Sequence, residues 1–180
     1  MQRRAFLGMA AGGLTSLVLP SVSWASVLGQ GPRRAVLKNL HTGEAFSELY
    51  YANGAYIPDA LAAANRVLRD WRTGEKTRIE PELFDALHAI SSKLETRAPF
   101  QIISGYRSPK TNAMLHAKSK GVASNSQHTL GKAVDVRLAG VELTNLRKAA
   151  LAVGAGGVGF YPVSNFVHVD TGRVRQWSGA

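Results

Sequence analysis

Residues 126–135 read SQHTLGKAVD, and this stretch organises the rest of the chain. Within it, His128 and Asp135 are both competent ligands for a first-row divalent metal. A third ligand is offered far downstream by His168, in the segment FVHVD at 166–170. Two imidazoles and one carboxylate, with a fourth position left for water, form a common catalytic zinc set. We therefore predict that these three side chains meet at one metal site.

The local sequence predicts how the three ligands come together. Residues 133–138 read AVDVRL, which predicts a strand with Asp135 on one face and the large apolar side chains on the other. His168 lies on a second predicted strand, and if the two strands are neighbours its ring comes within cross-strand reach of Asp135. His128 then closes the site from a loop. Gly131 in that loop lets the backbone turn or pass close to a neighbour without steric cost.

These residues resemble the M15 group of zinc D-Ala-D-Ala peptidases, which share the Hedgehog/DD-peptidase fold. The closer similarity is to the subgroup of murein endopeptidase K, and it covers essentially the whole chain after the N-terminal segment. The residues that carry the resemblance are Ser126, His128, Gly131, Ala133, Asp135 and His168, together with NLHTGE (39–44), ISGYRS (103–108), GGVGFYP (156–162) and SNFVH (164–168).

The resemblance implies a fold, a cofactor and a reaction. We expect an α+β single domain, a small antiparallel sheet with packed helices, over residues 34–180. The family pattern implies Zn²⁺ at His128, Asp135 and His168. It also implies hydrolysis of peptide cross-links in peptidoglycan during cell-wall growth or remodelling, including links between two meso-diaminopimelate residues.

The chain departs from the family pattern at one catalytic position. In many M15 relatives a Glu or Asp lies three residues before the last histidine ligand, but here that position is Asn165, which cannot act as a base. Asp170 is the first candidate for proton transfer, because it shares a strand face with His168 at roughly 6.5–7 Å and can act through a water. The alternative role for Asp170 is a carboxylate that orients His168.

Three further residues are candidates for contact with substrate. Arg107 follows a predicted buried strand at 100–103, where functional side chains are often presented. It could bind a substrate carboxylate through two parallel hydrogen bonds or stabilise a developing oxyanion. The alternative is a structural salt bridge. Ser126 and Gln127 are expected to contact substrate because they neighbour a ligand.

The first 25 residues predict a signal peptide of the twin-arginine type. Arg3 and Arg4 precede an apolar run, and SWA at 23–25 suits a cleavage site. An uncleaved anchor is the alternative, but a spanning helix needs roughly 20 apolar residues and this run is short and interrupted by glycine. We expect a periplasmic protein without a membrane anchor after cleavage, in which residues 26–33 form a short tether.

The charge favours an acidic partner. The formal net charge is +10, and removing residues 1–25 takes away two arginines and no acid, which leaves 10 − 2 = +8. An exported protein rarely meets nucleic acid, so the anionic cell wall is the expected partner.

The chain has no cysteine, so the fold must be stabilised by its hydrophobic core without disulfides. We expect a monomer.

The remaining periodic segments predict the scaffold. His41 is expected in a turn, and His116 is a weak candidate for a group behind the ligands. The expected elements are a hairpin (35–39 and 45–51), four helices (58–71, 81–96, from Ser108 to about 120, and 144–152), a glycine-broken strand (156–161) and a tail (172–180) with Trp177 packed.

Three functions remain open from the sequence. A zinc endopeptidase of peptidoglycan cross-links is the leading hypothesis. A D,D-carboxypeptidase that trims stem peptides would use the same site in a more closed cleft. A non-catalytic, zinc-containing peptidoglycan-binding module is the third, and Asn165 is the feature that supports it.

Overall fold

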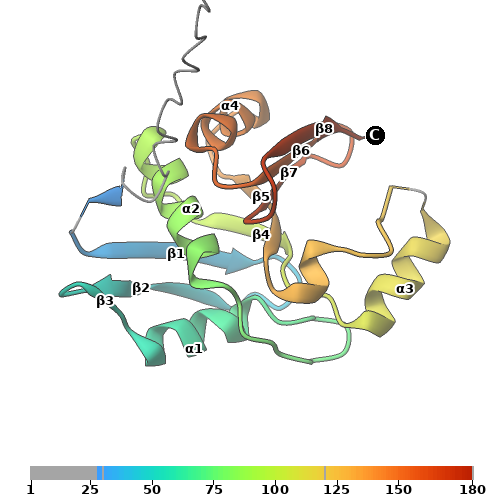
Figure 1. The fold of residues 1–180 in the computed structure, drawn as a ribbon, viewed down its shortest axis with the longest axis horizontal. Coiled ribbons are helices and arrows are strands. Elements are labelled where there is room, and N and C mark those ends of the chain that lie inside the picture. Colours follow the sequence, from blue (N-terminus) through green and yellow to red (C-terminus); the bar gives the residue numbers. More distant parts are fainter. Residues whose placement is uncertain (1–27, 30, 120, 180) are drawn as a thin grey trace, which may run out of the picture.

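The fold is built on one mixed sheet, which the computed structural model describes for residues 28–29, 31–119 and 121–179 (Figure 1). Eight strands of this part of the chain lie in the order β3-β2-β1-β4-β5-β7-β6-β8. The strands are β1 (Arg33–Asn39), β2 (Ala45–Ala52), β3 (Ala55–Tyr56), β4 (Phe100–Ser104), β5 (Ala133–Leu138), β6 (Gly157–Tyr161), β7 (Phe166–Asp170) and β8 (Arg175–Ser178). The helices are α1 (Pro58–Val67), α2 (Pro81–Lys93), α3 (Pro109–Lys118), α4 (Leu143–Val153) and the 3₁₀ helix η2 (Gln127–Leu130).

The predicted α+β class is confirmed, but the sheet is larger and less regular than expected. The pairs β1–β4 and β6–β8 are parallel, and the other pairs are antiparallel. A parallel pair needs a long crossover, which α1 and α2 supply between β1 and β4. The second parallel pair arises because the predicted tail contains β8, a short and largely polar strand at the edge of the sheet.

The two faces of the sheet have different roles. Alternate side chains of β5 point to opposite faces, so Val134 and Val136 enter the hydrophobic core while Asp135 faces the other way. Helices α1, α2 and α4 contribute to that core, and Figure 1 shows α3 standing apart from them at one side of the molecule. The face that carries Asp135 is therefore left open for a site.

Two helices end earlier than their apolar periodicity predicts. α1 ends at Val67 because the carbonyl of Leu68 accepts a hydrogen bond from the backbone N–H of Tyr106, at 2.8 Å. Gly105 packs directly against the same carbonyl, where a Cβ would collide with it. α2 ends at Lys93, and Glu95 then adopts a left-handed backbone with φ of 50°. Long-range contact therefore overrides helical periodicity at the end of α1.

The turn between β1 and β2 ties the hairpin to α1. The side chain of Asn39 accepts from the backbone N–H groups of His41 and Thr42 and donates to the carbonyl of Val67 at 2.8 Å. The ring of His41 is stacked on Trp71 with centroids 4.1 Å apart. His41 is therefore a turn residue, as predicted, and the NLHTGE segment has a structural explanation.

The N-terminal segment and the surface bear on the remaining expectations. The predicted signal peptide lies outside the described residues, and β1 already begins at Arg33, the last residue of the predicted tether. Within the described part of the chain, no helix is long and apolar enough to cross a membrane.

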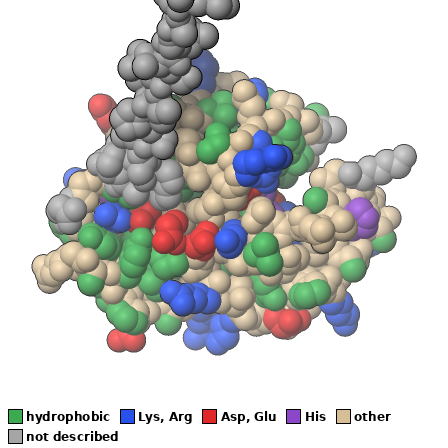
Figure 2. Space-filling model, viewed as in Figure 1, with side chains coloured by type: hydrophobic (Ala, Val, Ile, Leu, Met, Phe, Trp, Pro, Cys, Tyr) green, Lys and Arg blue, Asp and Glu red, His purple; other side chains and the backbone are tan. Residues whose placement is uncertain are grey.

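The charged side chains are mixed on the surface. On the face drawn in Figure 2, Lys and Arg side chains are scattered among acidic ones rather than gathered in one continuous patch.

Candidate metal centre

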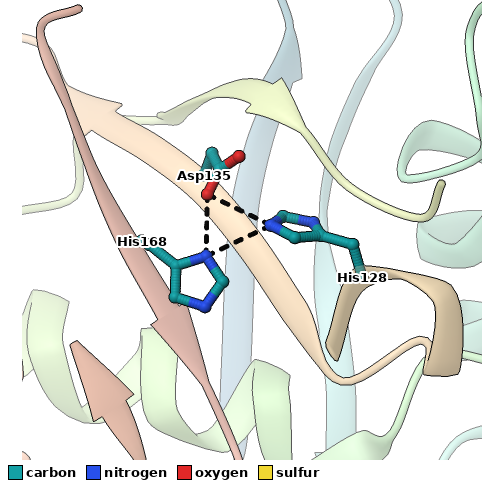
Figure 3. Close-up of side chains that lie close together, drawn as sticks. All are labelled: His128, Asp135 and His168. Carbon is teal, nitrogen blue, oxygen red and sulfur yellow. Dashed lines mark hydrogen bonds and ion pairs between the residues drawn. The ribbon is translucent and has the colours of Figure 1, made fainter. Parts of the chain in front are cut away.

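His128, Asp135 and His168 converge on one point (Figure 3). Asp135 lies directly opposite His168 in the antiparallel pairing of β5 and β7, as the strand pattern predicted. The Nε2 atom of His128 lies 3.2 Å from Oδ1 of Asp135 and 3.1 Å from Nδ1 of His168, and that nitrogen lies 2.9 Å from the same oxygen. All three side chains are buried. The predicted ligands are thus brought together from two strands and a 3₁₀ helix.

The 3₁₀ helix η2 fixes the position of His128. Ser126 caps it, because the Ser126 hydroxyl accepts the backbone N–H of His128 at 3.3 Å. Gly131 ends the helix with φ of 69°, a conformation that favours glycine. A Cβ at Gly131 would also collide with the carbonyl of Arg78. The close approach predicted for Gly131 is confirmed.

The partners of the two imidazoles decide which nitrogens face the site. The Nδ1 of His128 lies 2.7 Å from the carbonyl oxygen of Gly105, which can only accept, so Nδ1 donates and Nε2 directs a lone pair inward. In the same way, Nε2 of His168 donates to Oδ2 of Asp170 at 2.9 Å, and Nδ1 directs a lone pair inward. Together with the Asp135 carboxylate, three acceptors therefore face one another at about 3 Å, an arrangement that fits a divalent cation.

The electrostatics of the cluster favour positive charge at its centre. Burial opposes ionisation of Asp135, but the adjacent imidazole of His128 and hydrogen bonds hold its pKa well below its usual range. Burial lowers the pKa of His128. Burial also opposes charge on His168, yet its hydrogen bonds to Asp135 and Asp170 raise its pKa. The site keeps a buried carboxylate ionised and attracts positive charge.

Asp170 lies behind His168 and does not line the cleft. It is fully buried, and besides His168 it accepts from the backbone N–H of Gly157 at 3.0 Å and that of Gly172 at 2.8 Å. The guanidinium of Arg175 contacts both of its oxygens, at 3.1 and 2.6 Å. Burial raises the pKa of Asp170, but these donors together lower it below its usual value. Of the two roles that the sequence left open, this geometry favours orientation of His168 over proton transfer in the cleft.

Two glycines of β6 make room for side chains from β8. Gly159 lies opposite both His168 and Trp177, and a Cβ there would come within 2.6 Å of the Trp177 ring. A Cβ at Gly157 would come within 2.6 Å of the Arg175 guanidinium carbon and of Asp170. The glycines of the predicted glycine-broken strand therefore let the side chains of Arg175 and Trp177 cross β6.

Arg175 and Trp177 were not predicted as site residues. The indole of Trp177 lies 5.1 Å from the ring of His168, centroid to centroid, and donates to the hydroxyl of Tyr161 at 2.8 Å. The available signal was the alternation of Arg175 and Trp177 in the C-terminal segment, which matches the alternation of glycines in β6. The sequence predicts a tail over residues 172–180, and this prediction gives its side chains no specific neighbour.

Arg107 contacts the predicted metal ligand Asp135 directly. One guanidinium nitrogen donates to Oδ2 of Asp135 at 2.6 Å, and Nε donates to the hydroxyl of Ser104 at 2.9 Å. The salt bridge with Asp135 is nearly buried. The remaining terminal nitrogen has no protein hydrogen bond within the described residues and the side chain lines the cleft. The geometry therefore allows both the salt bridge and a contact with substrate.

The ligands open into a cleft of about 600 Å³. Ser126 and Gln127, predicted to contact substrate, both line it, although the hydroxyl of Ser126 is also used as the cap of η2. Arg107, His128 and Asp135 also line the cleft. The other lining residues come from the loop after α3, from the β6–β7 hairpin and from the C-terminal segment: Ser119, Gly121, Val122, Ala123, Asn125, Tyr161, Ser164, Phe166, His168, Arg175, Trp177, Ser178 and Gly179.

Two candidate residues lie away from the ligands. Asn165 is an exposed residue in the turn between β6 and β7, with φ of 54°. Asparagine tolerates this left-handed conformation better than most residues, which gives Asn165 a backbone role. His116 contacts the carbonyl of Val122 in the loop after α3, and not the ligand cluster.

Comparison with known proteins shows the family to which the chain belongs. The family model described as peptidoglycan L,D-endopeptidase MepK, an M15-type peptidase model, matches residues 28–177. The peptidoglycan L,D-endopeptidase MepK of Escherichia coli K12 is 46% identical over 175 residues, which span 97% of this chain and 96% of that protein. The probable peptidoglycan L,D-endopeptidase MepK of Haemophilus influenzae is 40% identical over 178 residues, 98% of this chain and 96% of that protein. The chain therefore belongs to the MepK family of M15-type peptidases.

Proposed function

We propose that this protein is a zinc-dependent peptidoglycan endopeptidase that hydrolyses peptide cross-links between two meso-diaminopimelate residues. The observation that carries the proposal is the set of three inward-facing acceptors on His128, Asp135 and His168 at the base of an open cleft. The names of the relatives support the substrate and the L,D type of bond. The resemblance noted from the sequence supplies the meso-diaminopimelate link.

The residues of the chain have distinct proposed tasks. Zn²⁺ held by His128, Asp135 and His168 would supply a Lewis acid and bring the pKa of a bound water toward neutrality. Arg107 neutralises the outer oxygen of Asp135 and presents its remaining N–H groups to the substrate. Asp170 keeps the proton of His168 on Nε2, so that Nδ1 stays available as a ligand.

The charge and the N-terminal segment support a place of action outside the cytoplasm. Peptidoglycan carries free carboxylates, which suit a protein with a net charge of +8 after residue 25. Export by the twin-arginine route is proposed from Arg3 and Arg4 and the apolar run that follows them. The periplasm is therefore the proposed compartment, with no membrane anchor after cleavage and with a monomeric mature protein.

Digestion of purified muropeptide dimers tests the proposal. Chains from residue 26 onward would be loaded with Zn²⁺ and incubated with dimers that contain either a meso-diaminopimelate–meso-diaminopimelate link or a D-Ala–meso-diaminopimelate link. We expect chelator-sensitive conversion of the first kind to monomers, resolved by mass spectrometry. Loss of the terminal D-Ala from stem peptides, without conversion of dimers, would indicate the D,D-carboxypeptidase instead.

One observation favours a second function, a zinc-containing module that binds peptidoglycan without cutting it. Asn165 replaces the acid of many relatives, and in the described residues the only carboxylate that lines the cleft is the ligand Asp135. Stoichiometric zinc together with tight binding of muropeptides and no conversion of either dimer would support this module.

A further inference from the structure

Tyr161 lies on the wall of the cleft, next to a metal ligand and outside the ligand set. It is the last residue of β6 and pairs with Phe166 of β7, which makes it the diagonal neighbour of His168 on the same face of the sheet. Its ring is stacked on that of Phe166, with centroids 4.4 Å apart and an interplanar angle of 19°. An aromatic side chain in a diagonal position can reach across to its neighbour. The ring of Tyr161 is therefore held beside the reacting centre.

The hydroxyl of Tyr161 has a proton without an acceptor. The indole Nε1 of Trp177 can only donate, so in the 2.8 Å hydrogen bond between them the hydroxyl oxygen of Tyr161 accepts. The hydroxyl proton must point elsewhere, and no protein atom of the described residues accepts it. Since Tyr161 lines the cleft, this proton is available to a substrate that binds there.

The other strong donors of the cleft are each paired with a carboxylate. Arg107 is paired with Asp135, and Arg175 is paired with Asp170. Both cations would be held in place by these buried partners during the reaction. In the described lining of the cleft, Tyr161 is the titratable side chain that has neither an ionic partner nor a place among the ligands.

We propose that Tyr161 is a catalytic residue, whose hydroxyl donates a hydrogen bond to the scissile carbonyl oxygen as negative charge develops there. The inference rests on the peptidase function proposed above and deepens it. Trp177 acts as a positioning residue, because its N–H fixes the hydroxyl oxygen and leaves only the proton free to point at substrate. A donor placed in advance where charge develops stabilises the transition state more than the bound substrate.

Tyr161→Phe tests the inference, because it removes the hydroxyl and keeps the stack on Phe166. Loss of one donor to an oxyanion lowers kcat by about 10²–10³ in a characterised hydrolase, and we expect a loss of about 100-fold here with little change in KM. Zinc content and the urea midpoint should match those of the wild-type protein. Tyr51→Phe is the matched control, since Tyr51 lies on β2 away from the cleft and its hydroxyl makes no hydrogen bond to the described residues.

A binding measurement gives a readout that does not depend on turnover. A phosphinate pseudopeptide carries a tetrahedral oxyanion in place of the scissile amide, and its dissociation constant can be measured by calorimetry on the zinc-loaded protein. We expect Tyr161→Phe to weaken phosphinate binding by about the same factor as kcat and to leave product binding unchanged. Trp177→Phe should give a smaller loss, and no further loss when it is combined with Tyr161→Phe.

Several results would overturn the inference. If Tyr161→Phe leaves kcat unchanged or raises KM alone, the hydroxyl is at most a substrate-binding group. If the variant loses zinc and stability in parallel with activity, the hydroxyl is a structural group. If the wild-type protein leaves every muropeptide dimer and stem peptide intact, the proposed function fails. The phosphinate titration then decides the role of Tyr161 by itself, because equal affinity of the wild-type protein and Tyr161→Phe would refute it.

Discussion

Asp170 and Arg175 are joined by two hydrogen bonds that cross β6 at Gly157, behind the proposed metal ligand His168. The pair connects the edge strand β8 to His168: Arg175 donates hydrogen bonds to Asp170, and Asp170 accepts one from Nε2 of His168. Each contact lies between 2.6 and 3.1 Å. The orientation of His168 on β7 therefore depends on β8, a segment that the sequence analysis predicted to be part of a tail.

Replacement of Gly157 should weaken metal binding although the residue is not a ligand. In Gly157→Ala, the added methyl group would displace Arg175 and press on Asp170. Loss of a partner that orients a ligand costs about 10–100-fold in metal affinity, and we expect a loss of this size. The measurement is a chelator competition for zinc. Gly31→Ala is the control, since a Cβ at Gly31 meets nothing within 4 Å, and equal affinities of the two variants would contradict the prediction.

Asp170→Asn separates the two roles considered for this carboxylate. The amide keeps the shape of the side chain but loses the charge that binds Arg175 and His168. If Asp170 orients His168, zinc affinity falls by about 10–100-fold and much of kcat returns at saturating zinc. If Asp170 transfers protons, kcat stays low when zinc is saturating. Asp59→Asn, an exposed change in the first turn of α1, should alter neither quantity.

Removal of a ligand should abolish metal binding and activity together. His128→Ala and His168→Ala each leave two of the three side chains that would bind zinc. We expect less than one zinc per chain by elemental analysis and no conversion of muropeptide dimers. His88→Ala is the matched control, because His88 contacts the carbonyl of Arg34 and does not line the cleft. Stoichiometric zinc in both ligand variants would refute the assigned site.

The sequence predicted the convergence of the three side chains because the pattern that places them is local. Alternation in β5 and β7 puts Asp135 and His168 on the face opposite the core, and the register of the two strands then brings them together. The end of α1 was wrong because a hydrogen bond from Tyr106, far along the chain, terminates the helix. β8 was missed because an edge strand buries little apolar surface and so carries a weak alternation. The strand before Arg107 was predicted correctly, but the bond of Arg107 to Asp135 depends on a pairing of β4 with β5 that no local pattern gives.

A buried charged cluster should decide the stability of the β1–β3 end of the sheet. The carboxylate of Asp85, on α2, accepts from the guanidinium of Arg33 at 2.8 Å and from the hydroxyls of Tyr50 and Tyr56 at 2.8 and 2.7 Å. Asp85→Leu would leave Arg33 buried and unpaired, and such losses cost about 3–5 kcal/mol. Urea unfolding measures the change. Glu82→Leu, on an exposed position of the same helix, should change the free energy of unfolding by less than about 1 kcal/mol.

The acid stability of the loop that carries Arg107 should depend on Asp70. This buried carboxylate accepts from the backbone N–H groups of Ser108 and Arg72, both at 2.9 Å. Burial raises its pKa, but hydrogen bonds from Thr111, Ser108 and Arg72 outweigh burial and lower it below its usual value. A lowered folded-state pKa stabilises the fold above the unfolded pKa of about 3.9, and this contribution is lost as the pH falls through the folded pKa.

Asp70→Asn should therefore reduce the free energy of unfolding at neutral pH, and the gap to the wild-type protein should close as the pH falls below about 4. Urea unfolding of both proteins at a series of pH values measures the gap. Asp59→Asn serves again as the control, because its exposed side chain should give a small difference at every pH. The prediction is contradicted if the difference in free energy of unfolding stays constant at pH values below the folded pKa. In that case Asp70 stabilises the loop without its charge, and its hydrogen bonds to Ser108 and Arg72 do not depend on ionisation.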